Sequence, residues 1–127
     1  MEQLALNGIT LEVAHEREKM IREWSMNPDN WEKPWPGFVE IHKLEGLLIE
    51  AEIPYQKIAH CGGWCICYIN ADGTKAGDAI EHTGSYGNAN DLLEVAGFDA
   101  EDVDGWLTAQ EAFEYFKRYH ETRKKTD

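Results

Sequence analysis

Basic residues are scarce in this chain. Its 127 residues include 12 lysines and arginines against 24 aspartates and glutamates, which gives a net charge of −12. Binding to nucleic-acid phosphates needs a basic surface that releases counterions, and anionic membranes attract basic segments in the same way. We therefore expect neither nucleic acid nor a membrane surface as a direct partner.

Long apolar runs and paired cysteines are also missing. The longest stretch without Asp, Glu, Lys or Arg covers residues 58–71, which is shorter than the roughly 20 apolar residues of a membrane-spanning helix. The first residues lack the basic region and apolar core of a signal peptide, so we expect none. Three closely spaced cysteines, Cys61, Cys65 and Cys67, are a poor framework for disulfides. A reducing, cytoplasmic location fits this composition best.

Between residues 84 and 116 there is no basic residue at all, whereas acidic residues number eight. Those that form a candidate protein-binding face are Asp91, Glu94, Asp99, Glu101, Asp102 and Asp104. Two interpretations stay open. The segment is either a solvated surface that keeps a small protein soluble, or a face that meets a basic protein surface, since charge complementarity speeds and orients such encounters.

Apolar periodicity and turn signals predict an α+β fold. Residues 4–13 alternate around Asn7-Gly8, which predicts a hairpin, while a competing interpretation starts a helix at Thr10. The other elements follow from hydrophobic period, prolines and glycines. Helices are expected at about 14–27, 38–51, 91–96 and 108–122, and strands at about 55–61, 64–70 and 75–83.

We therefore expect a single α+β domain over residues 1–127. Its core, residues 38–122, is an antiparallel sheet of three or more strands, packed by two longer helices and one short helix. The short helix is residues 91–96, and the last helix begins with a Thr108–Glu111 capping box. Residues 1–37 add the N-terminal hairpin or helix and a loop rich in tryptophan and proline.

Two hairpin turns bring metal-ligand types onto one face of the expected sheet. With Gly62-Gly63 as a turn, His60 lies opposite Cys65. With Asp72-Gly73 as the next turn, Cys65 lies opposite Ile80. The zinc-ligand types that then share this face are His60, Cys65, Cys67 and His82.

Three interpretations of these side chains stay open. Isoleucines share the face and free cysteines are often buried, so the cysteines fit a core. They also fit a metal site, with zinc as the only cofactor considered, although Cys-x-Cys is not the spacing of structural zinc knuckles. The third interpretation is a nucleophilic pair of Cys65 with His60, but the sequence supplies no orienting group or oxyanion hole for it.

Two tryptophans, Trp31 and Trp35, lie in the proline-rich segment 27–37. Their rings are expected to pin this loop to the body of the protein by burial. The alternative is that they line a small-molecule pocket together with Tyr86 of the glycine-rich loop at 84–88.

Several short segments carry a resemblance to known proteins. They are residues 47–55, 80–87, 92–94 and 107–113. Through them the region 44–120 resembles small uncharacterised accessory proteins encoded by phages and prophages. The resemblance implies an accessory protein of a mobile element and assigns no reaction.

The leading functional hypothesis is a non-enzymatic binding module. It presents the acidic region to a basic host protein, of the nucleic-acid-binding or defence type, and inhibits it. One alternative is a small metal- or thiol-dependent enzyme that uses the face with His60, Cys65, Cys67 and His82. Another is a sponge that binds a small molecule such as a nucleotide.

Overall fold

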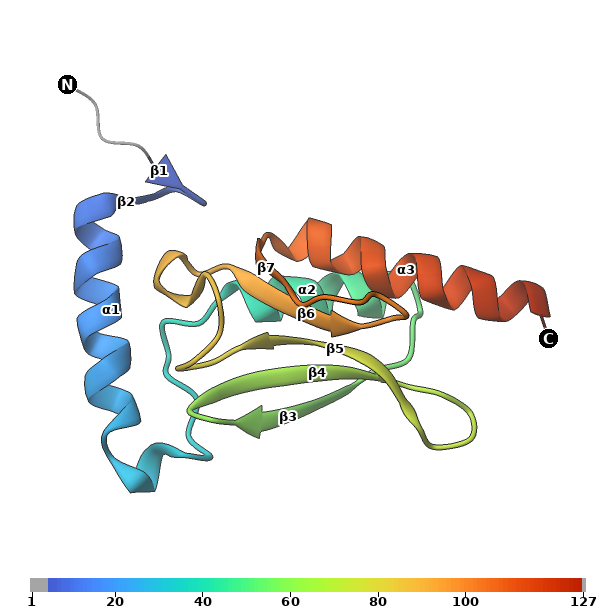
Figure 1. Cartoon of the computed structure of the whole chain (residues 1–127), viewed down its shortest axis with the longest axis horizontal. Coiled ribbons are helices and arrows are strands. Elements are labelled where there is room, and N and C mark those ends of the chain that lie inside the picture. The colour runs from blue at the N-terminus through green and yellow to red at the C-terminus, as the bar shows by residue number, and fades with distance from the viewer. Residues whose placement is uncertain (1–4, 127) are drawn as a thin grey trace.

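A five-stranded antiparallel sheet occupies the middle of the chain in the computed structural model, which describes residues 5–126 (Figure 1). Its strands, neighbours in space in their sequence order, are β3 (Gln56–His60), β4 (Gly63–Ile69), β5 (Lys75–Glu81), β6 (Leu93–Gly97) and β7 (Asp104–Leu107). Every neighbouring pair is antiparallel, so turns and short loops suffice to connect them. The predicted α+β fold with an antiparallel sheet is confirmed.

Helices α2 (Glu40–Glu50) and α3 (Ala109–Thr126) lie side by side along one face of this sheet (Figure 1). Alternate side chains of the strands point toward them. The residues buried in this core include Ile66, Ala79, Val95, Ile41, Leu44, Leu48 and Phe116. None of the described helices packs on the opposite face, which we call the open face. None of the helices within residues 5–126 is long and apolar enough to cross a membrane.

The N-terminal segment combines the two structures considered for it. Strands β1 (Ala5–Leu6) and β2 (Ile9–Thr10) form a hairpin; residue 4 lies outside the described residues. Helix α1 (Leu11–Ser25) follows at once, because Thr10 Oγ1 caps it by accepting a hydrogen bond from the Val13 N–H at 3.3 Å.

Helix α1 stands at one end of the sheet, beside the loop that follows β5 (Figure 1). Arg17 fastens it there. Its Nε donates to the Ala89 carbonyl oxygen at 2.8 Å, and its Nη2 donates to that of Gly37 at 3.1 Å. The guanidinium also lies 4.8 Å from the centre of the Trp35 ring. One side chain thus joins α1, the tryptophan-rich loop and the loop after β5.

The tryptophan-rich loop is held mainly through its backbone. After a 3₁₀ turn, η1 (Pro28–Asn30), the Gly62 N–H donates to the Trp31 carbonyl and the Trp35 N–H donates to the Gly62 carbonyl, both at 2.8 Å. The Trp35 ring packs edge-on against Phe38. The Trp31 side chain, however, is 59% exposed, so the expectation that its ring is buried is wrong.

The turn between β3 and β4 is Cys61-Gly62, not the predicted Gly62-Gly63. Cys61 and Gly62 both have positive φ, as a type I′ turn requires, and His60 pairs with Gly63. Gly63 lies in β4, where a Cβ atom would collide with the carbonyl oxygen of Glu81 in β5, so only glycine fits this position. Each glycine therefore serves a different purpose, and only one of them forms the turn.

This turn shifts the register of β3 by two residues. A two-residue shift keeps every side chain on its face, so His60 still shares the open face with Cys65. However, Ile58 rather than His60 lies opposite Cys65. The predicted pairing of Cys65 with Ile80 is confirmed.

The predicted short helix at 91–96 is wrong. Leu93 and Val95 point into the core while Glu94 lies on the open face, which is the alternation of strand β6. Only a 3₁₀ turn, η2 (Asn88–Asn90), precedes it. Pairing with β5 and β7 outweighs the local helical pattern, and β7 itself forms within a segment expected to be loop.

Candidate functional site

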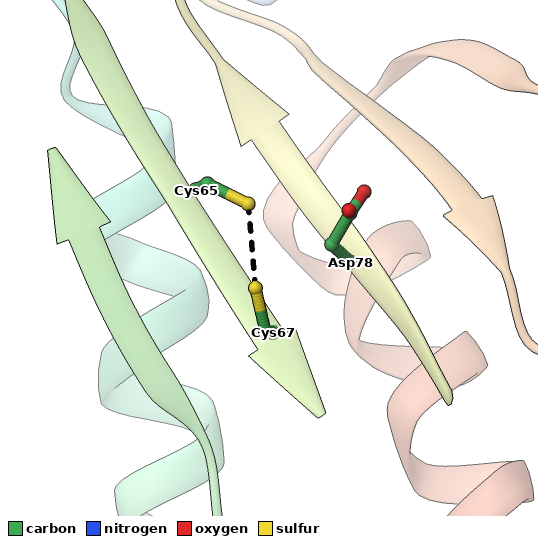
Figure 2. Close-up of side chains that lie close together, drawn as sticks. All are labelled: Cys65, Cys67 and Asp78. Carbon is green, nitrogen blue, oxygen red and sulfur yellow. Dashed lines mark hydrogen bonds between the residues drawn. The ribbon is translucent and has the colours of Figure 1, made fainter. Parts of the chain in front are cut away.

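Two cysteines and an aspartate meet on the open face of the sheet (Figure 2). Cys65 and Cys67 follow one another on the same side of β4, and their Sγ atoms are 3.5 Å apart. Asp78 pairs directly with Cys67 across the β4–β5 ladder. The two sulfur atoms and one carboxylate oxygen all lie within 4.8 Å of one another. We call these three residues the dithiol–carboxylate cluster.

The cluster favours the protonated form of the Cys65 thiol. Burial raises the pKa of the Cys65 thiol well above its ordinary range, and the Asp78 charge and Cys67 add to this rise. Lys75 lies at the rim, with its Nζ 2.6 Å from Asp78 Oδ2. A thiol with a raised pKa is a poor nucleophile at neutral pH, so this environment disfavours Cys65 as a reactive cysteine.

The two histidines lie at the other end of this face. His60 and His82 flank Gly63, and their ring centres are 5.8 Å apart. The paired residues Ile58 and Cys65 lie between the two histidines and Cys67 on this face. The four predicted ligands therefore share one face but do not converge.

The immediate partners of the histidines also differ from the predicted ones. His60 Nε2 lies 3.3 Å from Cys61 Sγ, and His82 Nδ1 accepts from the Gly84 N–H at 3.0 Å. Burial, and then the nearby His60, lower the pKa of His82. The predicted register with His60 opposite Cys65 is wrong, because the turn at Cys61-Gly62 places His60 opposite Gly63.

Asp91 does not belong to an exposed acidic face. It is buried, and its Oδ1 accepts the backbone N–H groups of Val39 and Glu40 at 2.9 and 3.0 Å. These are unsatisfied donors at the start of α2, where no local side chain caps the helix. The carboxylate of Asp91 is thus a structural cap supplied from a distant part of the chain.

The remaining predicted acidic residues do reach the surface. Glu94 is half-buried, and its Oε1 accepts from the Tyr86 N–H at 3.0 Å. The exposed ones lie on the β6–β7 connection and on β7, and we call them the acidic hairpin: Asp99, Glu101, Asp102 and Asp104. Within this set, Asp104 accepts a hydrogen bond from the Tyr115 hydroxyl at 2.6 Å.

The three aromatic residues proposed for a pocket lie apart. Trp35 packs against Phe38 and Arg17. Trp31 lines a cavity of about 170 Å³ beside the β3–β4 turn, and Tyr86 lines a different cleft. A shared pocket of Trp31, Trp35 and Tyr86 is therefore not formed.

The cleft that Tyr86 lines, which we call the aromatic cleft, has a volume of about 430 Å³ and lies between α1 and the loop after β5. Trp106 of β7 lines it from the other side, and Glu18 and Arg22 of α1 contribute charged groups. The Tyr86 and Trp106 side chains are 63% and 53% exposed. They adjoin because Gly105 has no side chain, so the Cβ of Tyr86 packs on its backbone.

Neither Trp106 nor Asp78 was among the site residues predicted from the sequence. The signal for Asp78 was present, because the predicted register already places it opposite Cys67. The signal for Trp106 was only its position, a large aromatic residue inside an acidic segment. Its neighbour Tyr86 is 20 residues away in the sequence, and only the folding of β7 beside the preceding loop joins them.

Comparisons of the chain with protein-family models, with curated proteins and with solved structures find no match.

Proposed function

We propose that the protein is a non-enzymatic binding module that holds a basic segment of another protein. The aromatic cleft receives part of this segment, and the acidic hairpin faces its positive charges. The observation that carries the proposal is the half-exposed pair Tyr86 and Trp106, which lines a cleft together with the carboxylate of Glu18. Large aromatic side chains are enriched at the centres of protein interfaces, where they provide much of the binding energy.

The chemistry of these surfaces suits lysine and arginine. A guanidinium or ammonium group packs over the face of a Trp or Tyr ring. Carboxylates around such a ring add attraction that speeds association and fixes orientation. Asp104 lies two residues from Trp106 on β7, so both kinds of contact come from one strand.

The backbone of Trp106 adds support. Its φ is +60°, a conformation that costs a non-glycine residue on the order of 1–3 kcal/mol. Its side chain recovers little of this by burial, because half of it stays exposed in the free protein. A partner that covered the ring would supply the missing burial.

The partner class follows from the charge. Strongly basic protein surfaces are typical of nucleic-acid-binding proteins. Together with the resemblance to phage and prophage accessory proteins, this favours a host protein of the nucleic-acid-binding or defence type, met in the cytoplasm. Occupying its basic face would inhibit it.

A labelled arginine-rich peptide tests the aromatic cleft by fluorescence anisotropy. We expect Trp106→Ala and Tyr86→Ala each to weaken binding by about 10-fold, the effect of losing an interface aromatic. Trp31→Ala is the matched control, because Trp31 is equally exposed but lies outside the cleft. Circular dichroism verifies that each variant is folded. Equal affinity for wild type and both cleft variants would refute the proposal.

Charge neutralisation tests the acidic hairpin with the same peptide. The neutralised variant carries Asp99→Asn, Glu101→Gln, Asp102→Asn and Asp104→Asn. The control has the same net charge and changes four exposed acidic residues elsewhere: Glu12, Glu16, Glu23 and Glu32, each to Gln. We expect association at low salt to slow about 10-fold in the first variant and much less in the control. Equal slowing in both would show that net charge alone attracts the peptide.

The cleft volume also favours a second candidate, a small-molecule sponge. Pockets for such ligands usually measure about 300–1,000 Å³, and Arg22 offers the cleft a cation for a nucleotide phosphate. A thermal-shift panel of nucleotides tests this candidate. Stabilisation by a nucleotide that Arg22→Ala abolishes would support it, and no shift across the panel would exclude nucleotides.

A further inference from the structure

The dithiol–carboxylate cluster has the dimensions of a metal site. Two thiolates bound at about 2.3 Å to a tetrahedral zinc ion are about 3.8 Å apart. The Sγ atoms of Cys65 and Cys67 are 3.5 Å apart, and a carboxylate oxygen of Asp78 is within 4.8 Å of both. Small side-chain rotations suffice to place all three atoms around one ion.

A disulfide or an ordinary core explains the cluster less well. Residues two apart on a strand have Cα atoms about 6.6–6.8 Å apart, the outer limit for a disulfide. The cluster also lies on the open face, where no described helix packs over it, whereas the core lies on the other side (Figure 1). An apolar core would gain nothing from the Asp78 carboxylate beside the thiols.

We propose that Cys65, Cys67 and Asp78 bind one zinc ion, or another thiophilic divalent cation of similar size. The two Sγ atoms and one Asp78 oxygen are the protein ligands, and a water molecule occupies the fourth, outward position. On binding, both thiols give their protons to solvent and become thiolates. The inference is independent of the proposed function, because it uses none of the residues of the aromatic cleft or the acidic hairpin.

Charge is conserved around this site. Two neutral thiols, the Asp78 carboxylate and the Lys75 ammonium sum to zero. A divalent ion with two thiolates, the same carboxylate and Lys75 also sums to zero. The side chain of Lys75 is half-exposed, and its Nζ lies 2.6 Å from Asp78 Oδ2. Its positive charge therefore balances the negative charge that remains on the three ligands and the ion. Ile58 and Ile80 flank Cys65 on both sides and reduce the access of competing water.

The ligand types select the metal. Thiolates favour zinc and similar soft ions, whereas magnesium and calcium require oxygen ligands. Three protein ligands with one open position match zinc sites that keep a water molecule, rather than the four-ligand structural sites. The histidines are not needed, because His60 and His82 lie beyond Cys65 at the other end of the face.

Cobalt(II) alone is the probe for this site, because thiolate ligands give it a charge-transfer absorption that oxygen and imidazole ligands lack. Reduced, metal-free full-length protein is titrated with cobalt and then with zinc. We expect one cobalt ion per chain, a charge-transfer band, the release of two protons per ion and displacement by zinc. Cys65→Ser and Cys67→Ser should each weaken binding by at least 10-fold, and Asp78→Asn by about 10-fold.

Matched controls separate the cluster from other ligands. Cys61→Ser removes the third thiol, and His60→Ala and His82→Ala remove the neighbouring imidazoles; all three should leave the cobalt affinity unchanged. A wild-type titration without the charge-transfer band would overturn the proposal. So would unchanged affinity in Asp78→Asn, a variant that leaves the buried thiols intact and is therefore informative even if a cysteine variant fails to fold.

Discussion

Glu81 shows what burial does to a single acidic residue. It is fully buried, its Oε1 accepts from the Ile41 N–H at 3.1 Å, and its Oε2 has no hydrogen-bond partner among the described residues. Burial, followed by the charge of the neighbouring Asp91, raises the pKa of Glu81 to about 11. Arg17 opposes this rise, but less strongly. Glu81 is therefore a neutral carboxylic acid at neutral pH.

This protonation makes stability depend on pH. The folded state binds a proton that the unfolded chain releases above its ordinary pKa of 4.5. The stabilisation is thus complete below about pH 4.5 and is lost as the pH rises toward 11, by up to about 1.4 kcal/mol per unit. Glu81→Gln keeps the acceptor for Ile41 and is always neutral. We expect its melting temperature to fall less than that of wild type between about pH 5 and 10.

A matched substitution isolates the effect of burial. Glu50→Gln removes an acidic residue at the exposed end of α2 and should leave the pH profile of wild type unchanged. The protonated form of Glu81 would be refuted if Glu81→Gln and wild type lost stability in parallel over the whole alkaline range.

At the scale of elements, the turn between β3 and β4 decides which residues face one another. Cys61 occupies the first central position of this turn with positive φ, which costs an ordinary residue roughly 1–2 kcal/mol. Asparagine tolerates this conformation, and Asn-Gly is the preferred type I′ pair. We therefore expect Cys61→Asn to raise the free energy of unfolding in urea by about 1 kcal/mol.

The opposite change distinguishes the two registers. Cys61→Val places a β-branched side chain at positive φ and should destabilise the protein by about 1 kcal/mol or more. If the turn were Gly62-Gly63, residue 61 would belong to a strand, where valine is favoured. Stabilisation by Cys61→Val would therefore contradict the Cys61-Gly62 turn.

Local signals in the sequence suffice for some elements and fail for others. Asp72-Gly73 predicts the β4–β5 register correctly from Trp64 to Tyr68, although an irregularity shifts it at Ile69. The Thr108–Glu111 capping box forms as predicted. The glycine pair at 62–63 misleads, because the need for Gly63 arises from the backbone of β5. Residues 91–96 also mislead, because pairing of β6 with β5 on one side and β7 on the other favours a strand over the local helical pattern.

The candidate sites divide in the same way. The shared face of Cys65 and Cys67 follows from the two-residue period of any strand. The interior position of Asp91 does not, because it caps a helix 52 residues away in the sequence. Likewise, Tyr86 and Trp106 adjoin only in the folded chain. Contacts between distant segments are the part of the site that periodicity and spacing do not contain.

At the scale of the whole molecule, charge is distributed unevenly along the chain. The eight acidic residues between 84 and 116 include the acidic hairpin and two residues in the first turns of α3, whereas Lys117, Arg118 and Arg123 follow along this helix. Acidic groups near the start of a helix and basic groups near its end suit the helix dipole. The acidic hairpin lies outside any helix, however, so this benefit does not explain it.

If the acidic hairpin serves binding, it should cost stability in the free protein. Four exposed carboxylates close together in the sequence repel one another, and Arg118 and Arg123 offset this only where they line clefts with Asp99 and Asp104. Neutralising all four should therefore raise the free energy of unfolding by up to about 1 kcal/mol in low salt. The gain should shrink as salt rises, because screening acts over about 10 Å at 0.1 M but only about 3 Å at 1 M. Urea unfolding of wild type and this variant at both concentrations measures the effect, with the variant neutralised at Glu12, Glu16, Glu23 and Glu32 as the control of equal charge. A variant less stable than wild type in low salt would mean that these carboxylates stabilise the fold, and their clustering would then need no partner to explain it.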